Sequence, residues 1–149
     1  MSGISNHYDS MTSIKAVIDA LSLSGLTGGT VIQEVATYQD GQSVLPFISI
    51  SPYGPEQTGD ETNFQDGCYY GVLVAIIAKP DVNALETRLG WRQSMRRKLN
   101  NHNFYAVGGP NNYNIKVEPG NVVEPRAYLD RNGFVSGFVV RCFFQEPRS

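Results

Sequence analysis

Residues 68–78 read CYYGVLVAIIA, and this stretch decides the fold. In an extended chain Val72, Val74 and Ile76 point to one side, and the apolar residues between them point to the other. A strand that is apolar on both faces belongs in the middle of a sheet whose two sides are covered. The sequence therefore predicts a central β-strand here, ended by the turn-forming residues 79–81.

Two more strands are expected before this one, at residues 30–38 and 44–51. Asp40-Gly41 lies between them, and this dipeptide is typical of a tight hairpin turn, so the two strands are predicted to pair with each other. Residues 52–66 then hold two prolines, two glycines, four acidic residues and no basic residue. This composition predicts a long loop or the arm of an extended hairpin.

Two amphipathic helices are expected around these strands. The first covers residues 10–24, where apolar residues recur every three or four positions, and it follows a flexible polar lead at residues 1–9. The second runs from Asp81, a residue suited to capping a helix, to about Asn101. Its apolar residues form two adjacent stripes, one of Val82, Leu85 and Leu89 and one of Trp91, Met95 and Leu99.

The rest of the chain is again rich in strand-like segments, which we expect near residues 104–107, 113–118, 126–130 and 134–145. In the last and longest of these, alternate positions are mostly aromatic or aliphatic. Strands and two helices in this order indicate one α+β domain at residues 10–149. We expect a largely antiparallel, mixed sheet with both helices packed on it.

Composition fits a folded domain of this kind. The 149-residue chain is 41% hydrophobic and 17% charged, so its surface relies on uncharged polar groups. Its net charge of −2 is unevenly divided: residues 1–66 carry eight acidic residues and one basic residue, whereas residues 67–149 carry six acidic and eleven basic ones. The fold either displays these charges on different faces or mixes them. No signal-peptide pattern or membrane-length apolar run is present, so a soluble protein without membrane contact is expected.

No residue pattern of a known catalytic type emerges. Cys68 and Cys142 lie in apolar strands, which favours buried free thiols over a disulfide. The cysteines and the isolated His7 and His102 lack the spacing of metal ligands. The glycine-rich segments lack the Lys and the following helix of a phosphate-binding loop, so they are interpreted as turns. We therefore expect no enzyme activity, no catalytic residue, no metal and no cofactor.

The second helix carries a cluster of positive charge. It consists of Arg88, Arg92, Arg96, Arg97 and Lys98. Three interpretations stay open: a solvated face, a subunit interface that pairs with acidic groups of a neighbouring copy, or a face that contacts DNA phosphates. In the second interpretation the partner-facing acidic groups are Glu56, Asp60, Glu61 and Asp66.

The order and texture of these segments resemble the tail terminator, or tail-completion, proteins of tailed bacteriophages. The similar segments are an amphipathic first helix reading SIKAVIDAL, a strand reading LPFISI, the acidic segment, the central GVLVAIIA, the basic helix and a closing hairpin that ends in FVVRCFF. The similarity extends from about residue 10 to residue 146. It lies in element order, because no signature motif carries it.

The resemblance implies a structural virion protein without catalytic residues. Such subunits form a ring, expected here to be a hexamer, that caps the tail tube, stops its polymerisation and joins the tail to the head connector. The implied partners are further copies of the chain, the tail-tube protein and neck or connector proteins, with DNA passing through the ring. The implied location is the tail or neck of the virion, after assembly in the host cytoplasm. Two alternatives are a neck or head-closure protein and a small nucleic-acid-binding module that uses the basic helix face.

Overall fold

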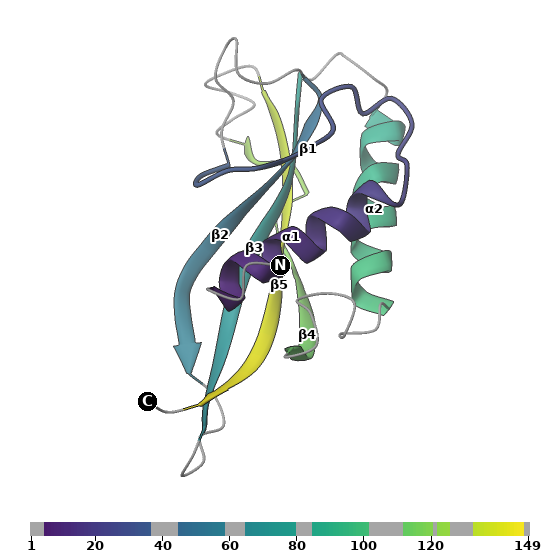
Figure 1. Cartoon of the computed structure of the whole chain (residues 1–149). Helices are drawn as coiled ribbons and strands as arrows, with labels where there is room; N and C mark the ends of the chain where they lie inside the picture. Colours follow the sequence, from purple (N-terminus) through teal and green to yellow (C-terminus); the bar gives the residue numbers. More distant parts are fainter. Residues whose placement is uncertain are drawn as a thin grey trace.

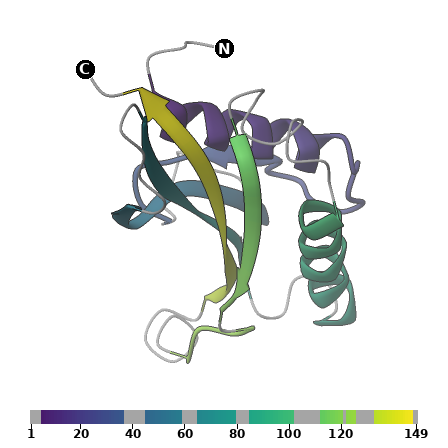
Figure 2. The same cartoon turned by 90° about the horizontal axis from the view of Figure 1, so that it is seen from below.

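The computed structural model describes residues 5–36, 45–58, 65–79, 85–101, 112–120, 122–125 and 133–147. The elements are α1 (Asn6–Asp19), β1 (Thr30–Ile32), β2 (Phe47–Thr58), β3 (Gln65–Ala78), α2 (Leu85–Asn101), β4 (Asn112–Pro119) and β5 (Phe134–Pro147). The strands form one sheet in the order β1-β2-β3-β5-β4, and both helices cover the same face of it (Figures 1 and 2). The expected α+β fold with a mostly antiparallel, mixed sheet is confirmed.

The predicted central strand does lie in the middle of the sheet. β3 pairs antiparallel with β2 on one side and with β5 on the other, so that Val74 lies opposite both Ile50 and Phe138. Val74 is fully buried beneath the helices, and Ala75 on the opposite face is 1% exposed. Burial on both faces is the environment that the unbroken apolar run required.

The expected hairpin upstream of β3 is wrong. β1 ends at Ile32, and it pairs with β2 in parallel, with Val31 opposite Ser49. Two strands joined by a tight turn are antiparallel, so a parallel pair needs a longer connection that carries the chain back along the sheet. Residues 33–36 have already left the strand, and the Asp40-Gly41 turn lies outside the described residues.

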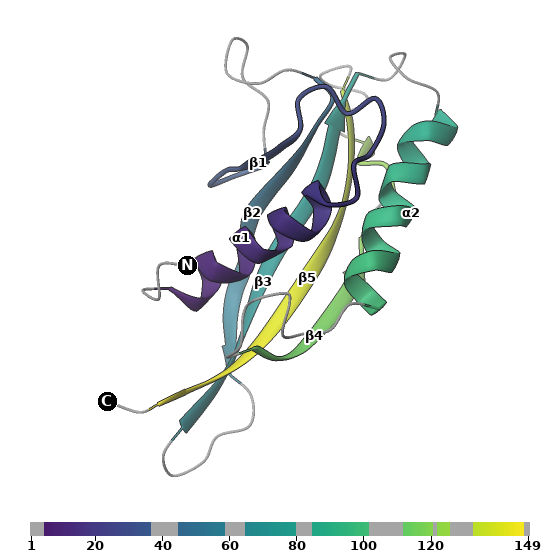
Figure 3. The same cartoon turned by 45° about the vertical axis from the view of Figure 1, so that its right-hand side comes forward.

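Residues 52–66 were expected to be a long loop or a hairpin arm, and the described part of this range, residues 52–58 and 65–66, forms the arm. β2 continues as a strand to Thr58 and β3 begins at Gln65. Pro52 keeps the regular register opposite Val72, and Pro55 lies within a register shift between Tyr53 and Gln57, where Gly54 adopts a φ of +65° that other residues rarely adopt. β5 follows the arm to its far end, and these strands extend well past both helices (Figures 1 and 3).

The first helix is displaced along the sequence from its expected position. α1 begins at Asn6, because the Ser5 hydroxyl caps it by accepting a hydrogen bond from the backbone N–H of Tyr8. Residues 6–9, expected in a flexible lead, are therefore the first turn of the helix. The imidazole Nε2 of His7 donates to the carbonyl oxygen of Gly71, 2.7 Å away, and ties this turn to the middle of β3. The helix ends at Asp19, five residues before the expected end.

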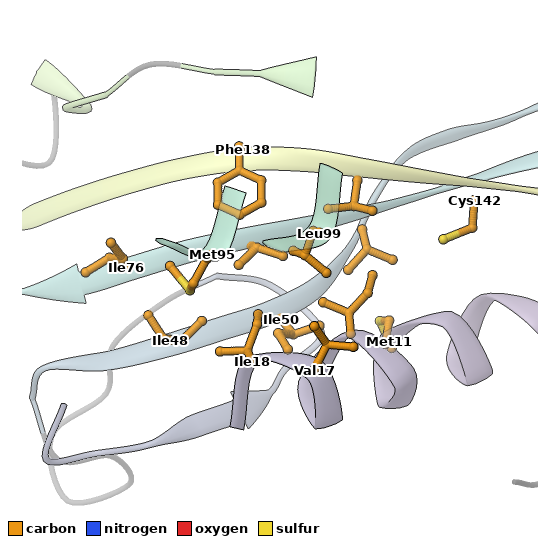
Figure 4. Packing of buried hydrophobic residues seen from close by; sticks show 14 of the residues in the cluster. Met11, Val17, Ile18, Ile48, Ile50, Ile76, Met95, Leu99, Phe138 and Cys142 are labelled. Carbon is orange, nitrogen blue, oxygen red and sulfur yellow. The ribbon is translucent and has the colours of Figure 1, made fainter. Parts of the chain in front are cut away.

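The core lies between the helices and the sheet. Ile14 and Ile18 of α1 and Met95 and Leu99 of α2 are buried against the apolar side chains of β2, β3 and β5 (Figure 4). The indole of Trp91 adds a polar link, since its Nε1 donates to the carbonyl oxygen of Ser24, 2.9 Å away. The stripe of Trp91, Met95 and Leu99 is thus confirmed as core.

The other expected stripe of α2 does not face the core. Leu85 is 51% exposed and Leu89 is half-buried, while Val82 lies outside the described residues. The positions that the leucines were expected to fill are held by arginines, as described below. Among the described residues, neither helix is long and apolar enough to cross a membrane.

Candidate interaction surfaces

The five cations of α2 do not share one surface. Arg88 and Arg92 are buried, each with 6% of its surface exposed, whereas Arg96 is half-buried and Arg97 and Lys98 are exposed. Arg88 and Arg92 lie on the same face of the helix as Met95 and Leu99, because residues three, four and seven apart are neighbours on a helix. The expectation that all five form one outward basic face is therefore corrected. The outward part is reduced to Arg96, Arg97 and Lys98.

Phenylalanines of β5 explain how arginines can occupy the buried face. The guanidinium of Arg88 lies over the ring of Phe134, 4.3 Å from its centroid, and that of Arg92 lies 5.7 Å from the centroid of Phe138. Aromatic faces attract cations, and a partly desolvated pair of this kind contributes on the order of 1 kcal/mol. The two arginines therefore bind α2 to β5 while their aliphatic stems fill space next to the core.

Arg92 is also the centre of a hydrogen-bond cluster. Its Nη1 donates to the Ser136 hydroxyl at 3.0 Å and to the Gly137 carbonyl oxygen at 2.7 Å, and its Nη2 donates to the Gly120 carbonyl oxygen at 3.3 Å. Burial, and to a smaller degree the positive charge of Arg96, lower the pKa of the Arg92 guanidinium from its ordinary value. These bonds join α2, β5 and the residue after β4, so the role shown for Arg92 is structural.

The exposed basic residues border a shallow hollow on the outer side of α2. Gln93, Ser94, Arg97 and Lys98 line it together with Leu21, which comes from the turn after α1, and its volume is about 370 Å³. A second hollow, of about 560 Å³, lies further toward the start of the helix and is lined by Leu85, Glu86, Leu89, Gly90 and Gln93. The outer side of α2 thus has two shallow hollows, one bordered by leucines toward the start of the helix and one bordered by cations toward its end.

Two of the four acidic residues expected to face a partner lie in the β2–β3 arm. Glu56 lies in β2 and Asp66 in β3, close to the far end of the arm, and Asp60 and Glu61 lie outside the described residues. β1 covers the outer edge of β2 only at residues 48–50, so in the described part of the chain the edge from Ser51 to Thr58 is open. An open strand edge offers unpaired backbone groups to another chain.

The face of the sheet opposite the helices carries an ion pair that no sequence pattern predicted. Arg141 of β5 pairs through Nε with the Glu118 carboxylate of β4, and its guanidinium lies 6.0 Å from the centroid of the Tyr53 ring. The pair depends on the register that places β4 beside β5. Next to it is a hollow of about 260 Å³ whose walls include Leu73 and Val135.

The two cysteines and His7, the described side chains considered as candidate reactive or metal-binding groups, are buried or hydrogen-bonded within the fold. Cys68 and Cys142 are buried free thiols, as expected, and burial raises the pKa of the Cys142 thiol to about 11. His7 is bonded to β3 as described above, and His102 lies outside the described residues. Within the described ranges, histidines, cysteines and acidic residues form no group of three that could hold a metal ion.

No protein-family model matches this chain, and no curated protein matches it.

Proposed function

We propose that this chain is a structural subunit of a phage virion, which forms a ring that caps the tail tube and joins the tail to the head connector. The observation that carries the proposal is the β2–β3 arm, which extends beyond the helices and, among the described residues, has one strand edge that no other strand covers (Figure 3). An arm of two or three strands buries little apolar surface by itself, and it gains stability when another chain covers it.

Charge supports the same conclusion. Glu56 and Asp66 lie in the described part of the arm, and the end of α2 carries the half-buried Arg96 and the exposed Arg97 and Lys98. A closed ring uses a heterologous contact, in which two different surfaces of each subunit meet on neighbouring copies. An acidic arm and a basic helix end provide two such surfaces, and their opposite charges would set the register of the contact.

The nucleic-acid-binding alternative loses support from the burial of two arginines. Phosphate binding through Arg88 and Arg92 would require both to leave the rings of Phe134 and Phe138, and Arg92 to leave three hydrogen-bond acceptors. Three exposed or half-exposed cations remain on α2, and the sequence pI is about 5.6, so α2 offers a small footprint for a dedicated DNA-binding surface. The neck or head-closure alternative shares the ring proposal but differs in its partner.

The proposal is tested by assembly with the tail-tube protein. The purified chain is added while tubes polymerise, and tube length and tube ends are followed by negative-stain electron microscopy. We expect ring-shaped caps on tube ends and shorter tubes as the chain concentration rises. Tubes of unchanged length with bare ends, while the chain instead binds the head connector, would replace the terminator assignment with the head-closure one. Binding to neither would overturn the virion proposal.

A further inference from the structure

We propose that two copies of this chain associate through the outer side of α2, antiparallel and about a two-fold axis midway between Gly90 and Gln93. α2 lies at the periphery of the described structure in all three views (Figures 1, 2 and 3). We assign a second α2 as the occupant of this exposed side because of the charge complementarity between Glu86 and Arg97. This inference does not rest on the proposed function, because a two-fold contact closes at two copies and needs no ring.

The residues on the outermost line of the helix decide the register. Glu86, Gly90, Gln93 and Arg97 are all exposed, and they follow one another at intervals of four, three and four residues. These intervals keep the four side chains on one face, as in the contact line of paired helices. The series of intervals is the same in both directions, so an antiparallel copy can align with it residue by residue.

Charge complementarity selects the antiparallel arrangement. When the two helices run in opposite directions about this axis, Glu86 of each copy lies opposite Arg97 of the other. Both ion pairs form at once, one at each end of the contact. A parallel arrangement in the same register would place Glu86 beside Glu86 and Arg97 beside Arg97, which is repulsive at both ends.

The middle of the contact is shaped for close approach. Gly90 lies opposite Gln93 of the second copy, and a Cβ atom built at Gly90 would meet nothing within 4 Å in the folded chain. A helix that presents glycine at its contact line lets the other backbone come nearer, because the distance between packed helices depends on the side chains at the contact. The Gln93 side chain of the second copy fills the space above Gly90.

Leu89 and Ser94 flank the contact line on opposite sides of it. In an antiparallel pair each side of the contact line meets the same side of the second copy. The Leu89 side chains of the two copies therefore approach each other along one border of the contact, and the hollow of about 370 Å³ that Ser94 lines lies along the other border. The contact is one helix wide, so we expect a weak dimer with a dissociation constant on the order of 10 to 100 µM.

The test is charge reversal followed by sedimentation. Wild-type chain at rising concentration should show a monomer–dimer equilibrium by analytical ultracentrifugation. Glu86→Arg and Arg97→Glu should each weaken the dimer by roughly tenfold or more, because each converts two attractive contacts into two repulsive ones. The double variant E86R/R97E should regain the dimer, since it restores both pairs with their signs exchanged.

Matched variants separate the contact from effects on folding. Both reversals oppose the helix dipole, so a dimer regained in the double variant cannot come from a more stable helix. Lys98→Glu reverses a neighbouring positive charge off the contact line and should leave the dimer unchanged. Gly90→Leu should keep the fold, as there is open space and leucine favours helix, yet it should abolish the dimer.

Three results would overturn the inference. One is a wild-type chain that stays monomeric up to roughly millimolar concentration, where a contact of even 4 kcal/mol would show. Another is a double variant no more dimeric than either single variant. The third is a dimer that survives Gly90→Leu, which would place the contact on another surface.

Discussion

Two arginines of α2 have different roles although they lie close together in the sequence. Arg92 is buried against Phe138 and donates to three oxygens, whereas Arg97, five residues further, is exposed at the outer side of α2. A buried guanidinium is tolerated because its donors are satisfied and its charge lies against an aromatic face. Removing it would leave a Ser136 hydroxyl and two carbonyl oxygens without their donor.

We therefore expect Arg92→Ala to lower the free energy of unfolding by about 2 to 4 kcal/mol, as loss of a buried charge-assisted bond cluster does. The matched variant Arg97→Ala removes the same groups from an exposed site and should change the free energy of unfolding by less than about 0.5 kcal/mol. Urea denaturation followed by circular dichroism measures both. Equal effects of the two variants would contradict the structural role assigned to Arg92.

Cys142 gives the stability of the fold a pH dependence of predictable sign. Its ordinary pKa of 9.0 applies to the unfolded chain, while burial raises the pKa in the folded chain to about 11. Between these values the unfolded state loses a proton that the folded state keeps, so this thiol's contribution is complete below pH 9 and falls as pH rises toward 11. We expect the stability difference between wild type and Cys142→Ala to shrink by about 2 kcal/mol across that window. A difference that is constant with pH would show that the thiol ionises equally in both states.

At the scale of elements, close pairing of β2 and β3 depends on Gly71. A Cβ atom at this position would lie 2.6 Å from the Tyr53 carbonyl oxygen and 3.2 Å from Nη1 of Arg141. The oxygen belongs to the backbone of the neighbouring strand, so it cannot move aside without shifting the strand itself. Gly71 thus sets the spacing at the point where the arm leaves the body of the sheet.

Gly71→Ala should lower the free energy of unfolding by about 1 to 3 kcal/mol, the usual effect of overpacking. Gly90→Ala is the control, because its Cβ atom would meet nothing within 4 Å and alanine favours helix, so it should raise stability by about 0.5 to 1 kcal/mol. Thermal melts of the two variants against wild type measure the contrast. A neutral Gly71→Ala would mean that the strands tolerate a wider spacing.

Some elements of the fold could be predicted from the sequence, and others could not. β3 was predictable because an apolar run on two faces has few other placements, and the stripe of Trp91, Met95 and Leu99 was predictable from its period. Local patterns do not contain the direction in which a strand is paired, so the parallel β1–β2 pair was missed. The burial of Arg88 and Arg92 was missed for a similar reason, since it depends on phenylalanines more than forty residues away.

At the scale of the whole molecule, some opposite charges of the chain lie on different elements. Glu56 and Asp66 lie in the β2–β3 arm, and Arg97 and Lys98 lie near the end of α2, on the helix-covered side of the sheet (Figure 1). Because Arg88 and Arg92 are buried, a contact between copies that uses the cations of α2 has Arg96, Arg97 and Lys98 available. That the acidic residues 56–66 face a partner stays a prediction, because Asp60 and Glu61 lie outside the described residues.

The ring proposal makes a prediction that no isolated dimer would satisfy. We expect Arg96→Glu with Lys98→Glu to prevent ring assembly, because each basic helix end would then repel the acidic arm of its neighbour. Asp60→Lys with Glu61→Lys should fail in the same way. Neither change touches Glu86 or Arg97, so the α2 dimer serves as an internal control for folding.

Mixing the two failed variants then distinguishes a heterologous ring from any other assembly. The acidic arm of the first variant matches the basic helix end of the second, and the lysine-bearing arm of the second matches the glutamate-bearing helix end of the first. Strictly alternating copies can therefore close, but only in rings with an even number of subunits, as a hexamer has. We expect electron microscopy and mass photometry to show rings in the mixture and none in either variant alone. Rings in both separate variants would contradict the arm-to-helix pairing, and a mixture that never closes would contradict the heterologous arrangement itself.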